Sequence, residues 1–197
     1  MKAARASLRR HGDIMDKFDE LESAVNSLMV RLEALEGLVS KAVSQVDPQM
    51  VYPFNDPPNP SIKFVSVHHS ASRADVTRAD VLEWHAQNGW PAEHSGYHVF
   101  IQADGKIEWG SMDASLKYIV GHQNPHTLGV CLAGNFHPSE RGYTGHPTDA
   151  QVDSLKRVLA VWQSRYPSAK VVPHRFFGGT VCPGDALAVW LEDNYAG

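Results

Sequence analysis

Residues 14–46 carry apolar side chains at alternating spacings of four and three, and this pattern constrains the fold more than any other feature of the chain. The positions are Ile14, Phe18, Leu21, Val25, Leu28, Leu32, Leu35, Val39, Ala42 and Val46. A repeat of 3.5 residues sustained over more than four heptads without a proline is typical of a coiled coil rather than of a globular helix. The sequence therefore predicts an N-terminal, oligomerising coiled-coil helix over residues 1–46.

The heptad register predicts how such helices associate. With Phe18 at position a, the neighbouring core positions hold Val25, Val39 and Val46 at a, and Leu21, Leu28 and Leu35 at d. This distribution favours two parallel strands. The flanking g and e positions pair Lys17 with Glu22, Arg31 with Glu36, Ala24 with Met29, and Leu38 with Val43. The first two pairs join opposite charges, whereas the apolar pairs suit a trimer or a larger assembly. We expect a parallel homo-oligomer whose number of chains stays open. The alternative is one amphipathic helix folded back on the rest of the chain.

Residues 47–60, DPQMVYPFNDPPNP, contain five prolines. Proline removes a backbone donor and pushes the residue before it toward extended conformations. This segment is predicted to be a semi-rigid linker, so that the globular domain covers residues 61–197.

Strand-like and helix-like patterns alternate within this domain. The apolar runs IKFVSVHHS, TLGVCLAGNF and AKVVPH predict buried strands, and GYHVFIQADGKIEWG predicts a hairpin that turns at its Asp-Gly pair. A helix is expected over residues 77–88, with Val81, Leu82 and Trp84 on its inner face. The predicted class is α/β, with a mixed central β-sheet flanked by helices.

Two more helices complete this expectation. Thr148 and Gln151 form a capping box ahead of apolar residues at helical spacing. The segment DALAVWLEDN predicts a closing helix near the C-terminus.

Charge and composition disfavour nucleic acid as a partner and bear on the location of the protein. The formal net charge of −4 and the pI near 6.2 provide no basic field for nucleic acid. No run approaches the roughly 18 apolar residues of a membrane span, and no signal-peptide pattern follows the basic N-terminus. Two cysteines make no disulfide framework, and Cys131 reads as a small buried hydrophobe. We expect synthesis in the cytoplasm.

The segment VVPHRFFGGTVCPGD places His174 eight residues before Cys182. His174 ends an apolar strand, as His68 and His69 do earlier, and strand ends are where functional groups gather. Two imidazoles and one thiolate suit Zn²⁺ and leave the fourth tetrahedral position open, as catalytic zinc sites do. The alternative is that these are unrelated buried residues.

Five ordered blocks add a resemblance to these local patterns. They read SVHHSAS, WHAQNGW, SGYHVFIQADGKIEWG, TLGVCLAGNF and PHRFFGGTVCPGD. Together they resemble the type 2 N-acetylmuramoyl-L-alanine amidases, a family that includes bacteriophage amidase lysozymes and peptidoglycan recognition proteins. The resemblance covers residues 61–197 and does not include the heptad segment. It implies the amidase fold and a Zn²⁺ cofactor.

The resemblance also assigns site residues position by position. It implies that His68, His174 and Cys182 are the zinc ligands, with His69 as the rival of His68, because an alternating strand cannot present both to one face. It implies that Tyr97 lies beside the reacting water. Thr180 stands where some phage enzymes carry a lysine, and its hydroxyl can donate a hydrogen bond but not a positive charge.

Substrate-lining residues are expected on loops around this site. His122 lies in a loop before a strand, and Trp90 and Asn124 are candidates by positional resemblance; the alternative for large aromatics is a role in the core. We predict binding of peptidoglycan through these three residues.

The leading hypothesis is a zinc-dependent amidase that cleaves the bond between N-acetylmuramic acid and L-alanine, as a phage or prophage lytic enzyme that reaches the wall after release or delivery. One alternative is a module that binds muropeptides without cutting them. Another is a virion-associated structural component, docked in a phage particle through the heptad segment.

Overall fold

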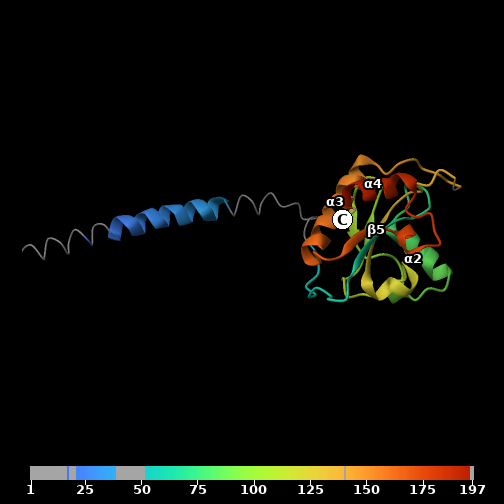
Figure 1. Ribbon diagram of the computed structural model, residues 1–197, viewed down its shortest axis with the longest axis horizontal. Helices are drawn as coiled ribbons and strands as arrows, with labels where there is room; N and C mark the ends of the chain where they lie inside the picture. Colours follow the sequence, from blue (N-terminus) through green and yellow to red (C-terminus); the bar gives the residue numbers. More distant parts are fainter. Residues whose placement is uncertain (1–16, 18–20, 39–51, 140, 196–197) are drawn as a thin grey trace, which may run out of the picture. The chain divides into compact units, whose positions relative to one another are not determined.

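The structure is a computed structural model that describes residues 17, 21–38, 52–139 and 141–195. The chain divides into two units, Met1–Pro48 and Gln49–Gly197. In the first unit, residues 21–38 form a helix (Figure 1). Its large apolar side chains are exposed by 50% for Val25 up to 65% for Val30. Phe18 and the heptad positions after residue 38 lie outside the described residues, so the coiled coil stays a prediction.

The second unit is built on a five-stranded sheet with the order β3-β2-β4-β1-β5. The strands are β1 (Phe64–His69), β2 (Val99–Ile101), β3 (Ile107–Trp109), β4 (Thr127–Leu132) and β5 (Lys170–Pro173). β1 runs parallel to β4 and β5, β2 runs parallel to β4, and only the β2–β3 hairpin is antiparallel among these pairs. The predicted mixed sheet is confirmed.

Helices cover both faces of this sheet. They are α2 (Arg78–Gln87), α3 (Asp149–Arg165) and α4 (Asp185–Tyr195), with short 3-10 turns η2 (Ala92–His94), η3 (Gly121–His126) and η4 (His174–Phe177). One face packs against α3 and α4 through a large apolar cluster that includes Val67, Val130 and Leu159. The other face forms a smaller cluster with α2 that includes Phe100 and Cys131. Figure 1 shows α2 well apart from α3 and α4.

The helix boundaries follow from local capping. Thr77 caps α2 through a capping box with Asp80, and Thr148 caps α3 through the predicted box with Gln151. Along α2 the inner face differs from the prediction, because Val81 is buried whereas Trp84 is 37% exposed. No helix in these described ranges has both the length and the apolarity to cross a lipid bilayer.

The end of the proline-rich segment is bonded to the second unit. The Tyr52 hydroxyl donates to Asp56 Oδ1 at 2.7 Å and accepts from the Asp113 backbone N–H at 2.7 Å. The Arg165 guanidinium lies 3.8 Å from the centroid of the Tyr52 ring, and Asn59 N–H donates to the Tyr166 hydroxyl. Although residues 47–60 are predicted as a linker, residues 52–59 therefore pack on α3.

Candidate metal centre and its surroundings

Two parallel strands deliver histidines to one place in the fold. Val67 of β1 is in register with Pro173 of β5, so His68 and His174 follow side by side. Their ring centroids are 4.4 Å apart, and the Cys182 sulfur lies 3.9 Å from His68 Nδ1. One ligand atom from each of the three residues lies within 4.8 Å of the others. No other group of metal-ligating side chains meets this spacing in the residues that the structure describes.

His69 lies outside this group and forms hydrogen bonds with the neighbouring segments. Its Nδ1 accepts a hydrogen bond from the Phe136 N–H at 3.1 Å, and its own N–H donates to the Cys182 sulfur at 3.4 Å. Successive side chains of a strand point to opposite faces. The structure thus brings His68, rather than His69, together with His174 and Cys182.

Burial sets the protonation of the two clustered imidazoles. Desolvation, with a smaller contribution from neighbouring His174, lowers the pKa of His68 well below 6.5. Burial also lowers the pKa of His174. His68 Nε2 is buried and has no hydrogen-bond partner among the described residues. Neutral imidazoles with an unused nitrogen, beside a thiol, fit a borderline-soft divalent cation.

The Gly-Gly pair between His174 and Cys182 has a conformational reason. Gly178 and Gly179 have φ of +88° and +73°, a region that glycine enters without steric cost. The turn that they make returns the chain so that Arg175 N–H donates to the Cys182 carbonyl at 2.8 Å. The Thr180 hydroxyl then accepts from the Cys182 N–H at 3.1 Å. Thr180 therefore holds the cysteine backbone in place.

Tyr97 lies against the cluster from the α2 face of the sheet. Its ring centroid is 5.0 Å from that of His68, and its side chain packs against the small apolar cluster that contains Cys131. Burial, followed by the nearby Cys131 and Cys182, raises the pKa of Tyr97 well above 10. Tyr97 is therefore a neutral phenol that can donate a hydrogen bond.

The local sequence does not predict the contact between Cys131 and Tyr97. Cys131 is in register with His68 across β1 and β4, which puts both side chains on the same face. Only the long-range pairing of the two strands reveals the contact, since the local run TLGVCLAGNF reads simply as buried.

The predicted substrate-lining residues differ in their surroundings. Trp90 is 38% exposed and its ring lies 4.3 Å from that of His85, which in turn is 6.3 Å from Tyr97. Asn124 Oδ1 accepts hydrogen bonds from the Ile119 and Val120 N–H groups, so its carbonyl holds the η3 loop. His122 is exposed in the same loop.

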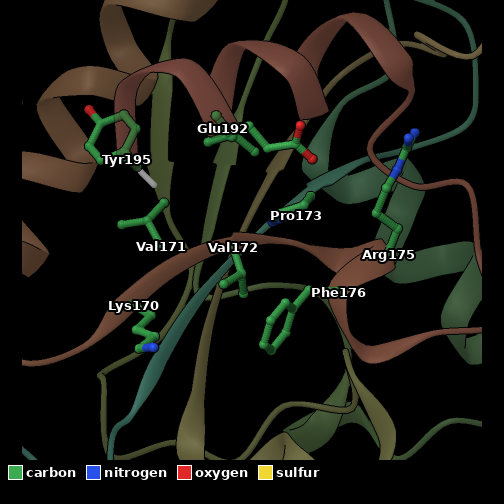
Figure 2. A pocket seen from close by; sticks show the side chains of 9 residues that line it. Lys170, Val171, Val172, Pro173, Arg175, Phe176, Glu192 and Tyr195 are labelled. Atoms are coloured by element: carbon green, nitrogen blue, oxygen red, sulfur yellow. The ribbon is translucent and has the colours of Figure 1, made fainter. Parts of the chain in front are cut away.

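A cavity of about 310 Å³ lies between β5 and α4, and it is separate from the ligand cluster. Figure 2 shows Val171 and Val172 of β5 with Glu192 and Tyr195 of α4 around it. None of His68, His174 and Cys182 lines this cavity.

Comparison with known proteins assigns the fold to a family. The Amidase_2 family, described as N-acetylmuramoyl-L-alanine amidase, matches residues 58–185. The endolysin of Klebsiella phage KP32 is 32% identical over 137 residues, which cover 66% of this chain and 85% of that protein. The endolysin of Escherichia phage T7 is 29% identical over 132 residues, with the same two coverages.

Solved structures support the same fold. The endolysin amidase LysCS of Clostridium intestinale has a TM-score of 0.55 at 24% identity, covering 68% of this chain and 85% of that one. Drosophila PGRP-LB has a TM-score of 0.58 at 24% identity, covering 75% of this chain and 86% of that one.

The family match contains the whole ligand cluster and Tyr97, and it spans most of the second unit. With its five-stranded mixed sheet, two histidines at the ends of parallel strands and a cysteine in the loop before α4, the chain belongs to the Amidase_2 family of N-acetylmuramoyl-L-alanine amidases.

Proposed function

We propose that the protein is a zinc-dependent lytic enzyme of a phage or prophage that hydrolyses the amide bond between N-acetylmuramic acid and L-alanine in peptidoglycan. The observation that carries this proposal is the cluster of His68, His174 and Cys182, whose ligand atoms lie within 4.8 Å inside the region matched by the amidase family. Three protein ligands with an open fourth position are typical of catalytic zinc.

The mechanism divides the work between the ion and the chain. Bound zinc supplies Lewis acidity toward the scissile carbonyl and lowers the pKa of a water molecule toward about 7. His68 and His174, both neutral, and the Cys182 thiolate would hold the ion. The Tyr97 phenol, which burial keeps protonated, donates a hydrogen bond to the oxyanion that develops on the amide carbonyl or orients the attacking water.

Thr180 contributes mainly through position. Its oxygen accepts from the Cys182 N–H, and its own hydroxyl proton stays available to assist the same oxyanion. The leaving amine of L-alanine must gain a proton as the C–N bond breaks.

The substrate lies along the surface that leads to this site. We place a sugar or peptide segment against Trp90, because its exposed ring stacks toward His85 and Tyr97. His122 and Asn124 would line the adjoining loop. Removal of these three side chains should weaken binding to sacculi more than it lowers the zinc content.

The heptad segment would bring several such domains together. Residues 14–46 are proposed to form a homo-oligomer, and the same segment could dock the enzyme in a phage particle. The exposed apolar side chains of residues 21–38 favour this role, since an isolated helix of this length is marginal in water. A virion-associated protein whose amidase-like domain only binds peptidoglycan is the second candidate. The enzyme would reach the wall after lysis begins or by delivery from outside.

Metal content and product analysis test the main proposal together. Wild-type protein should bind one equivalent of zinc, release L-alanine amino termini from purified sacculi, and lose both properties in Cys182→Ser. Zinc-loaded protein that binds sacculi but releases no amino termini would favour the binding-only candidate. Protein that binds no zinc would contradict the proposed cofactor.

A further inference from the structure

Two of the three proposed ligands lie in the loop between β5 and α4. His174 opens it and Cys182 comes near its end, and the segment between them is held by few backbone bonds. The Arg175 N–H donates to the Cys182 carbonyl at 2.8 Å and the Gly178 N–H donates to the Arg175 carbonyl at 3.0 Å. Glycine restricts its own backbone less than other residues do, so the pair between the ligands does little to fix their separation. Side chains must therefore help to set the separation of the two ligands.

The Arg175 guanidinium bridges the two ends of this loop. Nη2 donates to the Val181 carbonyl at 2.6 Å, and Nη1 donates to Asp185 Oδ1 at 3.0 Å. Arg175 directly follows His174, whereas Val181 directly precedes Cys182. The rigid, planar guanidinium thus joins the backbone beside His174 to the backbone beside Cys182 and to the first turn of α4.

Asp185 also lies close to a third segment. Its Oδ2 lies 3.3 Å from His137 Nδ1, and His137 Nε2 lies 2.7 Å from the Ser139 hydroxyl. The turn before Asp185 is pressed against this loop, because a Cβ on Gly184 would lie 2.3 Å from the Phe136 carbonyl carbon. Asp185 Oδ2 and His137 Nδ1 are close but do not form a hydrogen bond, so the packing of Gly184 on Phe136 is what places the end of the Cys182 loop against the segment after β4.

We infer that Arg175 is a positioning residue of the metal centre, and that its bonds to Val181 and Asp185 preset the distance between His174 and Cys182 for the ion. The inference rests on the proposed zinc site. Groups that orient metal ligands without touching the metal typically change metal affinity by about 10–100-fold when they are lost.

The same network adds little to the overall stability. The side chains of Arg175 and Asp185 are 29% and 55% exposed, and ion pairs as exposed as this one contribute little to the free energy of unfolding. Loss of the link should therefore show in zinc affinity rather than in folding, which separates positioning from a merely structural role.

The test compares full-length Arg175→Gln and Asp185→Asn with a matched control. Arg73→Gln removes another arginine–aspartate pair, at 2.9 Å to Asp75 with both side chains 77% exposed. The zinc dissociation constant is measured by competition with a chromophoric chelator, and thermal unfolding is followed for the metal-free proteins. We expect both site variants to bind zinc at least about 10-fold more weakly with nearly unchanged metal-free melting, and Arg73→Gln to match wild type.

The double variant sharpens the result. Because both substitutions break one link, Arg175→Gln with Asp185→Asn should bind zinc no more weakly than the weaker single variant. Wild-type zinc affinity in Arg175→Gln overturns the inference and leaves the proposed function intact, whereas a wild-type protein that binds no zinc overturns the proposed function itself. If Arg175→Gln does not fold, Arg175→Lys replaces it, since lysine cannot bond both partners in a fork.

Discussion

Tyr97 is the residue whose chemistry depends most on its neighbours. Burial, followed by the nearby Cys131 and Cys182, raises the pKa of its hydroxyl, and its ring lies beside His68. We predict that Tyr97→Phe keeps its zinc but loses about 100-fold or more in amidase turnover, because it lacks the donor for the developing oxyanion. Zinc content by atomic absorption and the release of amino termini from sacculi check both parts.

Cys131→Ala is the control for that substitution. It removes the thiol that packs beside the phenol but keeps the phenol itself, so it should retain more activity than Tyr97→Phe. Turnover of Tyr97→Phe equal to that of wild type would contradict a catalytic role for the hydroxyl.

At this scale the sequence predicts the ligand group better than its surroundings. His68, His174 and Cys182 stand at strand ends and before a helix, which are local features. The Cys131 contact and the Asn124 hydrogen bonds to residues 119 and 120 depend on strand register and on a loop conformation. Neither is encoded in a short stretch of sequence.

Among the elements, α3 donates hydrogen bonds to a buried charge, Asp113, which lies in the loop after β3. The Asp113 carboxylate is fully buried and accepts hydrogen bonds from Trp162 Nε1, Arg165 Nε and the Tyr166 hydroxyl, at 2.9–3.0 Å. We predict that Asp113→Ala lowers the free energy of unfolding by about 3 kcal/mol, because three donors, one of them charged, lose their acceptor. Urea denaturation measures this change.

The control for Asp113 is a carboxylate with little to lose. Asp153 is 65% exposed and lies 3.5 Å from Lys156, so Asp153→Ala should change the free energy of unfolding by less than about 0.5 kcal/mol. Equal effects of the two substitutions would show that the buried network contributes nothing special.

The proline-rich segment shows why the start of the folded domain cannot be predicted from local composition. Its composition indicates a linker, yet Tyr52 and Asp56 find partners on α3 and in the loop that contains Asp113. Proline content reports the backbone's preference for extended structure, and it carries no information on whether the side chains find a surface more than 50 residues away.

In the predicted coiled coil of residues 14–46, the charged side chains predict whether the helices run parallel or antiparallel. In a parallel pair, basic Arg31 at g faces acidic Glu36 at e, whereas an antiparallel pair sets like charges together. We predict that Leu21→Cys chains form a disulfide with each other on mild oxidation, because equal d positions meet only in the parallel arrangement. Non-reducing electrophoresis measures the cross-link.

Ser27→Cys serves as the matched control, since position c faces outward and should stay uncrosslinked. Neither native cysteine forms a disulfide, and both are buried. Cross-linking of Leu21→Cys only when it is mixed with Leu32→Cys, a cysteine at position a, would indicate an antiparallel pair and contradict the register.

For the whole molecule, the fold and the His-His-Cys group are predicted from different kinds of sequence information. The alternation of strands and helices was sufficient to predict the mixed sheet, because burial patterns are local. The meeting of His68 with His174 requires β1 and β5 to be neighbours, which are more than 100 residues apart in sequence. Only the resemblance between ordered blocks supplied that pairing in advance.

The whole fold also contains a buried imidazole that makes it sensitive to acid. His98 is buried, with Nδ1 accepting from the Gly129 N–H and Nε2 lying 2.9 Å from the Ser115 carbonyl. Burial lowers the pKa of His98 from 6.5 to about 4. Between these values the unfolded chain binds a proton that the folded chain excludes, so stability falls as the pH drops from about 6.5 to about 4.

We predict that this single group removes about 3 kcal/mol of stability by pH 4 relative to pH 7, at 1.36 kcal/mol per unit of pKa. His98→Gln offers an amide that can replace both hydrogen bonds without titrating. The free energy of unfolding, measured by urea between pH 7 and pH 4.5 on metal-free protein, should therefore fall less steeply in His98→Gln than in wild type. Parallel pH profiles would assign the acid sensitivity to other groups, because the difference between the two slopes isolates the proton that His98 takes up on unfolding.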